Sequence, residues 1–391
     1  MKKVLLAGTA ILGLAALASP AQAEVKLDLG GFFRGYAMFT DNDEPAGAAN
    51  SLREFDFRRH TEIHFSGETT TDNGLTIGVH NEIELGGAED TNEAYMYASG
   101  GWGRVNFGSE DGAAYLLQVS APSADSNVDG MRVYMQGLNT NLWDGGNFDA
   151  GSVLGYDHAD FRDTDRLTYM TPKWNGFQAG VSYAPESGQN AIGNHVGAMA
   201  TDEDPGEFEN LWELAARWDG EYEGFGISFG AGYSDAGTED DLAAGIGVVG
   251  SDDLQTWNVG LNVAFDAFNV GAAYHTTDNG IGGSAIACNN AGIVPASCDG
   301  DTDTWVVGAG WDNGPYHVGA SWLNSETEED AFAAADTSEI EVDRFTVGGG
   351  YTYGPGMTFR GAVAFGSADA GAVGVDDNDF TQVTIGTDVQ F

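Results

Sequence analysis

Hydrophobic and polar residues alternate along most of the chain, in segments of about ten residues separated by turn-forming residues. In the first segment Leu27 and Phe33 share one parity, whereas Asp28 and Arg34 share the other. A soluble β-sandwich alternates in the same way, but repeats of this length between turns are typical of transmembrane barrels. The pattern therefore predicts strands with one apolar and one polar face.

Two further segments show this alternation over more residues. Their apolar parity holds Phe55, Phe57, Ile63, Phe65, Leu75, Ile77, Val79, Ile83 and Leu85. Their polar parity holds Glu54, Asp56, Arg58, His60, Glu62, His64, Thr76, His80, Glu82 and Glu84. Because a charge on the lipid face costs about 2–4 kcal/mol at mid-membrane, we expect the second set to face the interior.

The connections between segments are of two kinds. Short, turn-forming connections lie at 72–74, 101–103, 175–176, 223–224, 266–267, 312–315 and 354–356. Every second connection is long and acidic, at roughly 40–52, 86–92, 119–165, 187–210, 238–252, 278–302, 326–342 and 368–378. Short turns at one rim and long loops at the other are typical of outer-membrane barrels.

These boundaries delimit sixteen segments, with both ends of the mature chain at the rim of short turns. We therefore predict an all-β fold, a 16-stranded antiparallel transmembrane β-barrel with long outer loops and short periplasmic turns. A barrel of about 16 to 18 strands encloses an aqueous channel, whereas a barrel of about eight strands is filled by side chains.

Aromatic residues gather near the segment ends on the apolar parity, as two girdles at the lipid interfaces require. The set is Trp212, Trp218, Phe225, Tyr233, Trp257, Phe265, Tyr274, Trp305, Trp311, Tyr316, Trp322, Tyr351, Tyr353 and Phe359. The last segment keeps the alternation and ends on Phe391.

The first residues have the three regions of a secretory signal peptide. Lys2 and Lys3 form a basic start, an apolar stretch follows over 4–18, and Ala21 and Ala23 form a small-x-small cleavage site. The apolar stretch is shorter than the roughly 20 residues that span a bilayer as a helix. We expect residues 1–23 to be removed and residues 24–391 to form the barrel.

Composition supports export and a strand-rich fold. The 391 residues include 58 Gly, 21 Phe, 14 Tyr and 9 Trp but only 9 Pro, a mixture that suits strands and tight turns. Without the two leader lysines, 13 basic residues face 60 acidic ones, a net charge of −47. This charge excludes a nucleic-acid-binding surface. In a channel it would favour cations, although it is also compatible with a merely solubilising surface.

Few motifs indicate metal or catalytic chemistry. Cys288 and Cys298 lie ten residues apart in one long loop, which suits a local disulfide in an oxidising compartment. Asp299, Asp301 and Asp303 have the alternating spacing of oxygen ligands, but the glycine and closing glutamate of an EF-hand are missing, so at most weak structural calcium is expected. No H-E-x-x-H motif occurs and no G-x-S-x-G elbow precedes a helix, and we predict no enzyme, no metal centre and no cofactor.

Several stretches resemble the general diffusion porins of Gram-negative bacteria, and among them the alphaproteobacterial porins. They are GRVNFGSE at 103–110 leading into the longest loop, RLTYMTP at 166–172 leading out of it, and the terminal Phe391. The resemblance implies that Phe391 is the signal read by the barrel-assembly machinery. It also implies a homotrimer in the outer-membrane lipid.

In that family the third long loop folds into the barrel and presents acidic groups to a basic wall. The matching loop is 119–165, the longest in the chain, with Asp125 and Asp129 as the candidate acids. A structureless loop of this length is uncommon unless it has a function. An ordinary solvated role for the two acids is equally compatible with the sequence.

The candidate basic wall follows from strand parity. Arg34, Arg58, Arg166 and Arg360 all lie on the polar parity, with His80 continuing the row. Facing loop acids, they would set up a transverse field at the narrowest point. Alternatively, they only neutralise interior carboxylates.

Together these features predict a porin of the outer membrane of a Gram-negative bacterium. We expect a water-filled channel for passive diffusion of small hydrophilic solutes and ions, with a preference for cations. A substrate-specific outer-membrane channel is the alternative, and saturable block of the conductance by one solute would distinguish it.

Overall fold

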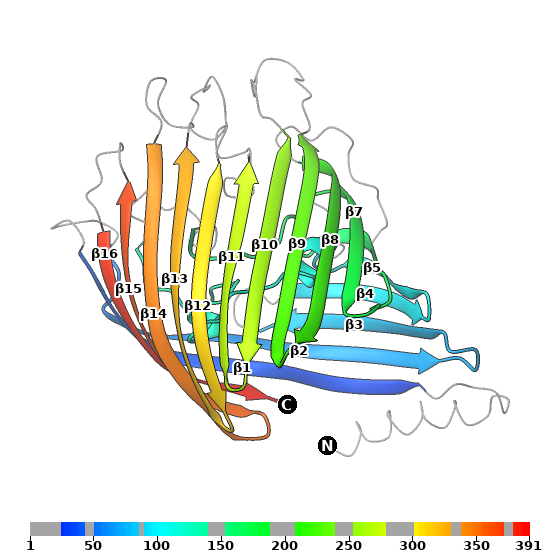
Figure 1. Ribbon diagram of the computed structural model, residues 1–391, viewed down its shortest axis with the longest axis horizontal. Helices are drawn as coiled ribbons and strands as arrows, with labels where there is room; N and C mark the ends of the chain where they lie inside the picture. Colours follow the sequence, from blue (N-terminus) through cyan, green and yellow to red (C-terminus); the bar gives the residue numbers. More distant parts are fainter. Residues whose placement is uncertain are drawn as a thin grey trace.

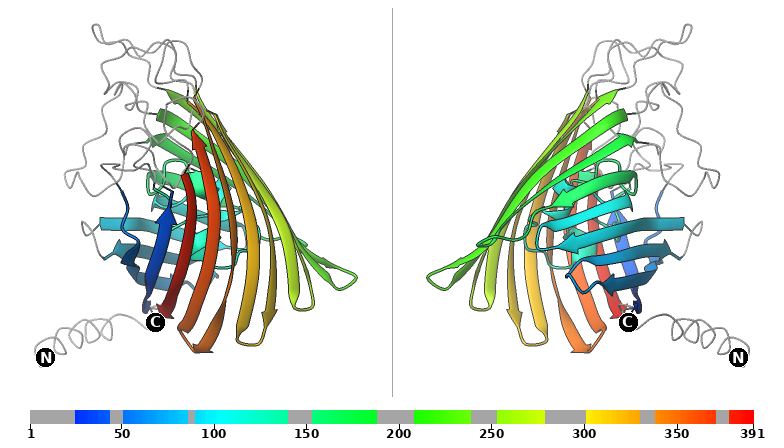
Figure 2. Two further views of the ribbon diagram at one scale, coloured as in Figure 1. Left: turned by 90° about the vertical axis from the view of Figure 1, so that its left-hand side faces the viewer. Right: turned by 90° about the vertical axis from the view of Figure 1, so that its right-hand side faces the viewer.

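The computed structural model describes residues 25–43, 51–85, 90–139, 153–187, 208–238, 253–278, 301–329, 338–370 and 378–391. Sixteen antiparallel strands form one closed barrel in which each strand pairs with its neighbours in the chain and β1 pairs with β16. Figure 2 shows the tilt of the strands within the wall. The predicted fold class is confirmed.

The strands differ in length, and β1 and β14 are the longest. Their bounds are β1 Lys26–Asn42, β2 Phe55–Thr70, β3 Thr76–Glu84, β4 Asp90–Gly100, β5 Gly103–Ser109, β6 Asp165–Met170, β7 Phe177–Glu186, β8 Phe208–Tyr222, β9 Phe225–Thr238, β10 Leu254–Phe265, β11 Phe268–Asp278, β12 Thr302–Asn313, β13 Tyr316–Glu329, β14 Ser338–Gly354, β15 Met357–Ala370 and β16 Asn378–Gln390. Two one-turn helices, α2 (Ala113–Leu116) and α3 (Ser126–Asp129), lie between β5 and β6.

The ends of the chain close the barrel. Strands β1 and β16 pair from Phe32 with Gln390 to Asn42 with Phe380. Beyond this ladder the N–H of Gly31 donates to the carbonyl of Phe391 at 3.1 Å, and the N–H of Phe391 donates back at 3.2 Å. The terminal residue is therefore part of the hydrogen-bonded wall, and its side chain is exposed.

The seven predicted turns all lie where consecutive strands meet at one rim. Two have positive φ at both central residues, at 48° and 84° for Asn175 and Gly176 and at 50° and 84° for Glu223 and Gly224. These are the dihedrals of a type I′ hairpin, whose twist matches that of the flanking strands. The turn residues thus set the register of the ladders at this rim.

The predicted loop bounds were wrong by several residues in three places. Strand β13 continues to Glu329 and β14 starts at Ser338, inside the expected loop 326–342. Likewise β4 starts at Asp90, inside the expected loop 86–92. The hydrogen-bonded ladder of β13 and β14 continues to the pair Glu329 and Ser338. The strands therefore extend beyond the apolar residues from which their bounds were predicted. Conversely, β5 ends at Ser109, so the third long connection starts at 110 and not at 119.

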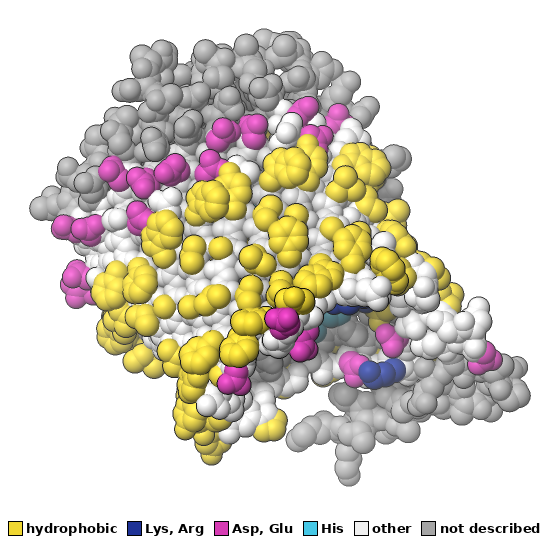
Figure 3. All heavy atoms as spheres, in the orientation of Figure 1, with side chains coloured by type: hydrophobic (Ala, Val, Ile, Leu, Met, Phe, Trp, Pro, Cys, Tyr) yellow, Lys and Arg dark blue, Asp and Glu magenta, His cyan; other side chains and the backbone are white. Residues whose placement is uncertain are grey.

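On the face shown in Figure 3, apolar side chains form a belt on the outer surface, bordered at one end of the strands by acidic side chains. Aromatic rings pair across neighbouring strands near both rims. The pairs are Tyr183 with Trp212, Tyr233 with Trp257 and Tyr274 with Trp305 on the long-loop side, and Phe225 with Phe265 and Tyr316 with Tyr351 on the turn side. They form the two girdles expected at the interfaces of a bilayer. Among the described residues, no helix has the length and apolar character needed to cross a membrane.

A charge placed on the apolar belt tests its contact with lipid. Val259 lies near the middle of β10 and is 42% exposed on the outer face. We expect Val259→Arg to lower the free energy of unfolding from lipid vesicles by about 2–4 kcal/mol, as measured by urea titration. Val259→Leu is the control and should unfold like the wild type. An equal effect of both substitutions would contradict a lipid-facing position.

Candidate functional site inside the barrel

The described parts of the connection between β5 and β6, residues 110–139 and 153–164, lie inside the barrel. Side chains of this inner segment, as we call these two stretches, pack on inward-facing residues of the wall. One apolar cluster joins Val128 and Met135 to Tyr36, Met38 and Ala362. The inner segment therefore occupies part of the lumen.

A row of inward-facing glycines lets the backbone of the inner segment lie directly on the wall. A Cβ added at Gly260 in β10 would lie 1.9 Å from the carbonyl oxygen of Val119, and one at Gly308 in β12 would lie 1.9 Å from that of Pro122. Close approach of a second backbone is a known reason for glycine in a strand. The row is Gly230, Gly260, Gly271, Gly308 and Gly319, one on each strand from β9 to β13.

The two predicted loop acids lie at α3 and are buried, each about 1% exposed. Asp125 caps the helix by accepting from the N–H of Asn127 at 3.0 Å, and it also accepts from the hydroxyl of Tyr36 on β1 at 2.8 Å. Asp129 accepts from the N–H groups of Ala124 and Asp125 at 2.8 and 2.7 Å and from Ser321 on β13 at 2.5 Å. These bonds tie α3 to β1 and to β13, which β14, β15 and β16 separate in the barrel wall.

Burial raises the pKa of Asp129, and the hydrogen bonds from Ser321 and Ala124 oppose this shift. A carboxylate that accepts from two backbone N–H groups and a hydroxyl is a structural anchor. Its contact with solute is minor because so little of it is exposed.

Two of the predicted basic residues meet beside α3. The guanidinium of Arg360 forms ion pairs with Asp125 at 3.3 Å and with Asp388 at 2.9 Å. Asp388 also lies 3.6 Å from the Nε atom of Arg34, and Arg34 stands over the ring of Phe32 at 3.8 Å. Strands β15, β16 and β1 therefore present one alternating row of charges.

His80 and Arg58 lie further along the same wall. His80 lies 2.7 Å from the hydroxyl of Ser66 through Nδ1 and 2.9 Å from Glu82 through Nε2. Arg58 is exposed on β2, and no hydrogen bond or ion pair joins its guanidinium to another described residue. The structure does not bring either residue into the charge row at Asp388.

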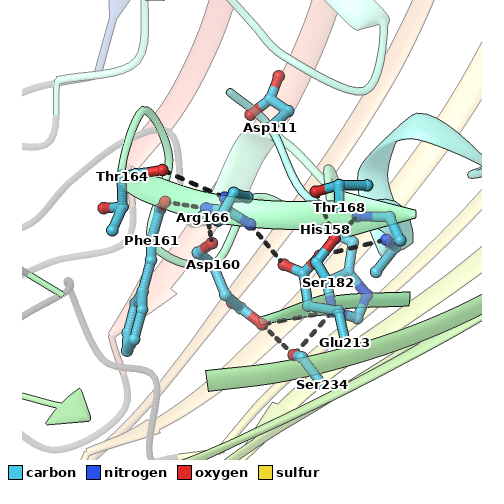
Figure 4. Close-up of polar contacts among 12 residues, drawn as sticks. Asp111, His158, Asp160, Phe161, Thr164, Arg166, Thr168, Ser182, Glu213 and Ser234 are labelled. Atoms are coloured by element: carbon cyan, nitrogen blue, oxygen red, sulfur yellow. Dashed lines mark hydrogen bonds and ion pairs between the residues drawn. The ribbon is translucent and has the colours of Figure 1, made fainter. Parts of the chain in front are cut away.

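Arg166 lies away from the other predicted basic residues, in a buried polar cluster (Figure 4). Its guanidinium forms an ion pair with Glu213 at 3.0 Å, and both side chains are only 1% exposed. It also donates to the carbonyl oxygens of Asp160 and Phe161, in the returning part of the inner segment. Arg166 on β6 thus holds the inner segment against β8.

His158 extends this cluster to β9 and β10. Its Nε2 atom lies 2.8 Å from the hydroxyl of Ser234, and its Nδ1 atom lies 2.7 Å from the amide of Asn258. Ser234 in turn donates to Asp160 (Figure 4). Burial alone would raise the pKa of Asp160, but the hydrogen bonds from His158 and Ser234 and the charge of His158 outweigh it and lower the pKa to about 2. The hydrogen bonds of the buried polar cluster therefore join the returning part of the inner segment to β9 and β10, and the cluster acts as a fastening.

Several partners of these residues were not predicted from the sequence. Asp388, Glu213 and Ser321 each bind a predicted residue and lie on the polar parity of their strands. Parity alone would have placed their side chains inside. It does not show which of the inward positions meet, because that depends on the path of the inner segment.

Other predicted positions lie elsewhere. Cys288, Cys298 and Asp299 lie outside the described residues. Asp303 stands in β12 and accepts from the hydroxyl of Tyr274 at 2.6 Å. Asp303 thus supports an aromatic side chain of the girdle.

A closed barrel of sixteen strands with an apolar belt and a charged, partly filled interior defines the class of outer-membrane channel proteins. The model of the Gram-negative porin family matches residues 8–371. The chain therefore belongs to the Gram-negative porin family, and it forms a diffusion channel in the outer membrane. Porins of this family need no cofactor.

Solved porin structures share the fold. OmpF of Salmonella typhi in complex with daunomycin has a TM-score of 0.61 at 18% identity, over 94% of this chain and 98% of that chain. An anion-selective porin from Comamonas acidovorans has 0.58 at 16%, over 94% and 100%. OmpT of Vibrio cholerae in its trimer form has 0.57 at 12%, over 94% and 99%. A comparison with curated protein sequences finds no match.

Breaking the buried ion pair tests the fastening. Glu213→Ala leaves the Arg166 guanidinium buried without its carboxylate, and we expect the free energy of unfolding to fall by about 3–5 kcal/mol. Urea titration in detergent micelles measures it. The control is Lys173→Ala, which breaks the exposed pair with Asp219 at 3.0 Å and should change stability by less than about 1 kcal/mol. Similar losses in both variants would contradict a fastening role.

Proposed function

We propose that this porin passes small hydrophilic solutes and ions by passive diffusion and prefers cations. The observation that carries the preference is the pairing of three interior arginines with acidic side chains. Arg360 pairs with Asp125 and Asp388, Arg166 with Glu213, and Arg132 with Asp111 and Asp157. Paired in this way, these arginines add little positive potential to the lumen, and the acidic excess of the chain dominates.

Acidic side chains at the long-loop rim support the same preference. Strand ends at this rim carry exposed carboxylates, and Figure 3 shows acidic side chains along one edge of the apolar belt. They include Asp253, Asp278, Glu326, Asp369 and Asp379. Such a ring raises the local concentration of cations at the mouth of a channel, and salt weakens the effect.

The inner segment supports a size limit on the solutes. We assign the narrowing of the channel to the predicted loop 119–165, whose described parts lie against the wall. Arg34 and Arg360 are 22% and 23% exposed in their side chains, and with Arg58 and His80 they would contact passing solutes. Asp125, Asp129 and Arg166 would instead hold the inner segment in place, because they are buried.

The remaining assignments concern assembly. We propose that residues 1–23 are removed on export, that Phe391 is read by the barrel-assembly machinery, and that three chains form a homotrimer in the outer-membrane lipid. The Vibrio cholerae porin of the same fold is described in a trimer form, which supports the last point. The chain has no enzymatic role in this proposal.

The ion preference is tested by the reversal potential of the purified protein in planar bilayers with a salt gradient. We expect the sign of a cation-selective channel, with a selectivity that decreases as ionic strength rises. A potential of the anion-selective sign would refute the preference and leave the diffusion channel intact. Saturable block by one solute would instead favour a substrate-specific channel.

The glycine row offers a test of the size limit. Gly308→Ala places a methyl group against the carbonyl of Pro122, which must move by about 1.5 Å towards the axis to reach van der Waals distance. We expect a lower single-channel conductance. The matched control is Gly226→Ala, an inward glycine of β9 whose added Cβ has nothing nearer than 3.8 Å. Equal conductances in both variants and the wild type would show that the inner segment does not limit passage.

A further inference from the structure

Histidine and glutamate alternate on the inner face of two neighbouring strands. Strand β2 reads His60, Glu62 and His64 at every second position, and β3 reads His80 and Glu82 in the same way. Alternate residues of a strand face the same side. The register pairs His64 with Glu82 and Ser66 with His80. The topology therefore gathers these side chains in one patch of the lumen wall.

Three of these side chains offer ligand atoms at metal-binding separations. Atoms of His64, His80 and Glu82 all lie within 4.8 Å of one another. The Nδ1 atom of His64 lies 3.3 Å from Glu82 Oε1, and the Nε2 atom of His80 lies 2.9 Å from the same oxygen. Tetrahedral zinc with bonds of about 2.0–2.1 Å separates its ligand atoms by about 3.3 Å. The three groups are thus close to the spacing that such an ion imposes.

The second nitrogen of each histidine is already held by the wall. His64 bonds through Nε2 to Glu62 at 2.9 Å, and Glu62 is itself held by His60 at 2.8 Å. His80 bonds through Nδ1 to the hydroxyl of Ser66 at 2.7 Å. In metal sites the ligand histidine is usually oriented by such a carboxylate or hydroxyl at its other nitrogen. Here these partners leave His64 Nδ1 and His80 Nε2 both directed at Glu82.

We propose that His64, His80 and Glu82 form a binding site for a divalent transition-metal ion, with Zn²⁺ as the best-fitting ion. Two imidazoles and one carboxylate suit zinc and its neighbours in the first transition series. They do not suit Ca²⁺ or Mg²⁺, which take oxygen ligands. The three side chains are 28%, 19% and 19% exposed, so the ion enters from the lumen and keeps one position open to water.

No metal centre was expected from the sequence because the chain lacks helical spacings such as H-E-x-x-H. On a strand the equivalent spacing is two residues, and the third ligand comes from the neighbouring strand. The competing explanation is a ladder of hydrogen bonds that only joins β2 to β3. A metal site predicts that the purified protein binds zinc, whereas a purely structural hydrogen-bond ladder does not.

Direct binding provides the first test and does not depend on the proposed ion preference. The full-length protein, folded in detergent, is titrated with Zn²⁺ by isothermal calorimetry, and with Co²⁺ by visible absorption. We expect one ion per chain and a cobalt spectrum of low coordination number, with no heat from Ca²⁺ or Mg²⁺. A wild-type protein that binds no zinc at micromolar free concentration overturns the proposal.

Variants separate this site from other zinc-binding groups. His64→Gln and Glu82→Gln should each abolish the site, and Glu62→Gln, which alters only the orienting partner, should weaken binding about 10- to 100-fold. The matched control is His317→Gln, another inward histidine, paired with Asp312 at 2.8 Å, which should bind like the wild type. Equal zinc binding in all variants overturns the proposal.

Two further measurements guard against misfolding and connect the site to the pore. Folding of each variant is checked on gels by the slow migration of the unboiled, folded form. If His64→Gln or Glu82→Gln fails to fold, the zinc affinity of Glu62→Gln is the test. In planar bilayers, Zn²⁺ in the lumen should lower the wild-type current reversibly and leave the His64→Gln current unchanged. Zinc binding without a change in current would support the site and show that it lies outside the ion path.

Discussion

A polypeptide in lipid must pair every backbone N–H and C=O group within itself, and for strands this requires a closed barrel. The pairing of β1 with β16, extended by the bonds between Gly31 and Phe391, meets this requirement. Once the wall is closed, each side chain has only two directions, towards lipid or towards the lumen. The parity of a residue in the sequence therefore decides its surroundings, and the girdles, the belt and the charged interior all follow.

The inner segment covers part of the wall, so water does not reach all of the polar side chains in the interior. Several buried charges pair with residues far away in the sequence, as Arg166 does with Glu213 and Arg360 with Asp125 and Asp388. Small residues complete the fit, since Gly260 and Gly308 admit the backbone of the inner segment. A buried charge without a partner would be unfavourable, so the segment and the wall stabilise each other.

Strand periodicity also explains the histidine patch. Residues two apart on β2, such as Glu62 and His64, share the inner face, and the ladder with β3 supplies Glu82 at the same level. A helix would bring together residues three or four apart. The same residue types therefore need different sequence spacings on a helix and on a strand to form one site. On a barrel strand, residues of one site lie two positions apart.

The sequence by itself determined the strand number, the turns and the inward or outward direction of side chains, because alternation and turn chemistry are local properties. Arg34, Arg360 and His80 could be placed inside on this basis. Only the tertiary structure decided that Asp125 and Asp129 are buried anchors, that Arg166 stands apart from the other arginines, and that Asp388 joins Arg34 to Arg360. These outcomes depend on closure and on the path of the inner segment, and both bring together residues that no local pattern relates.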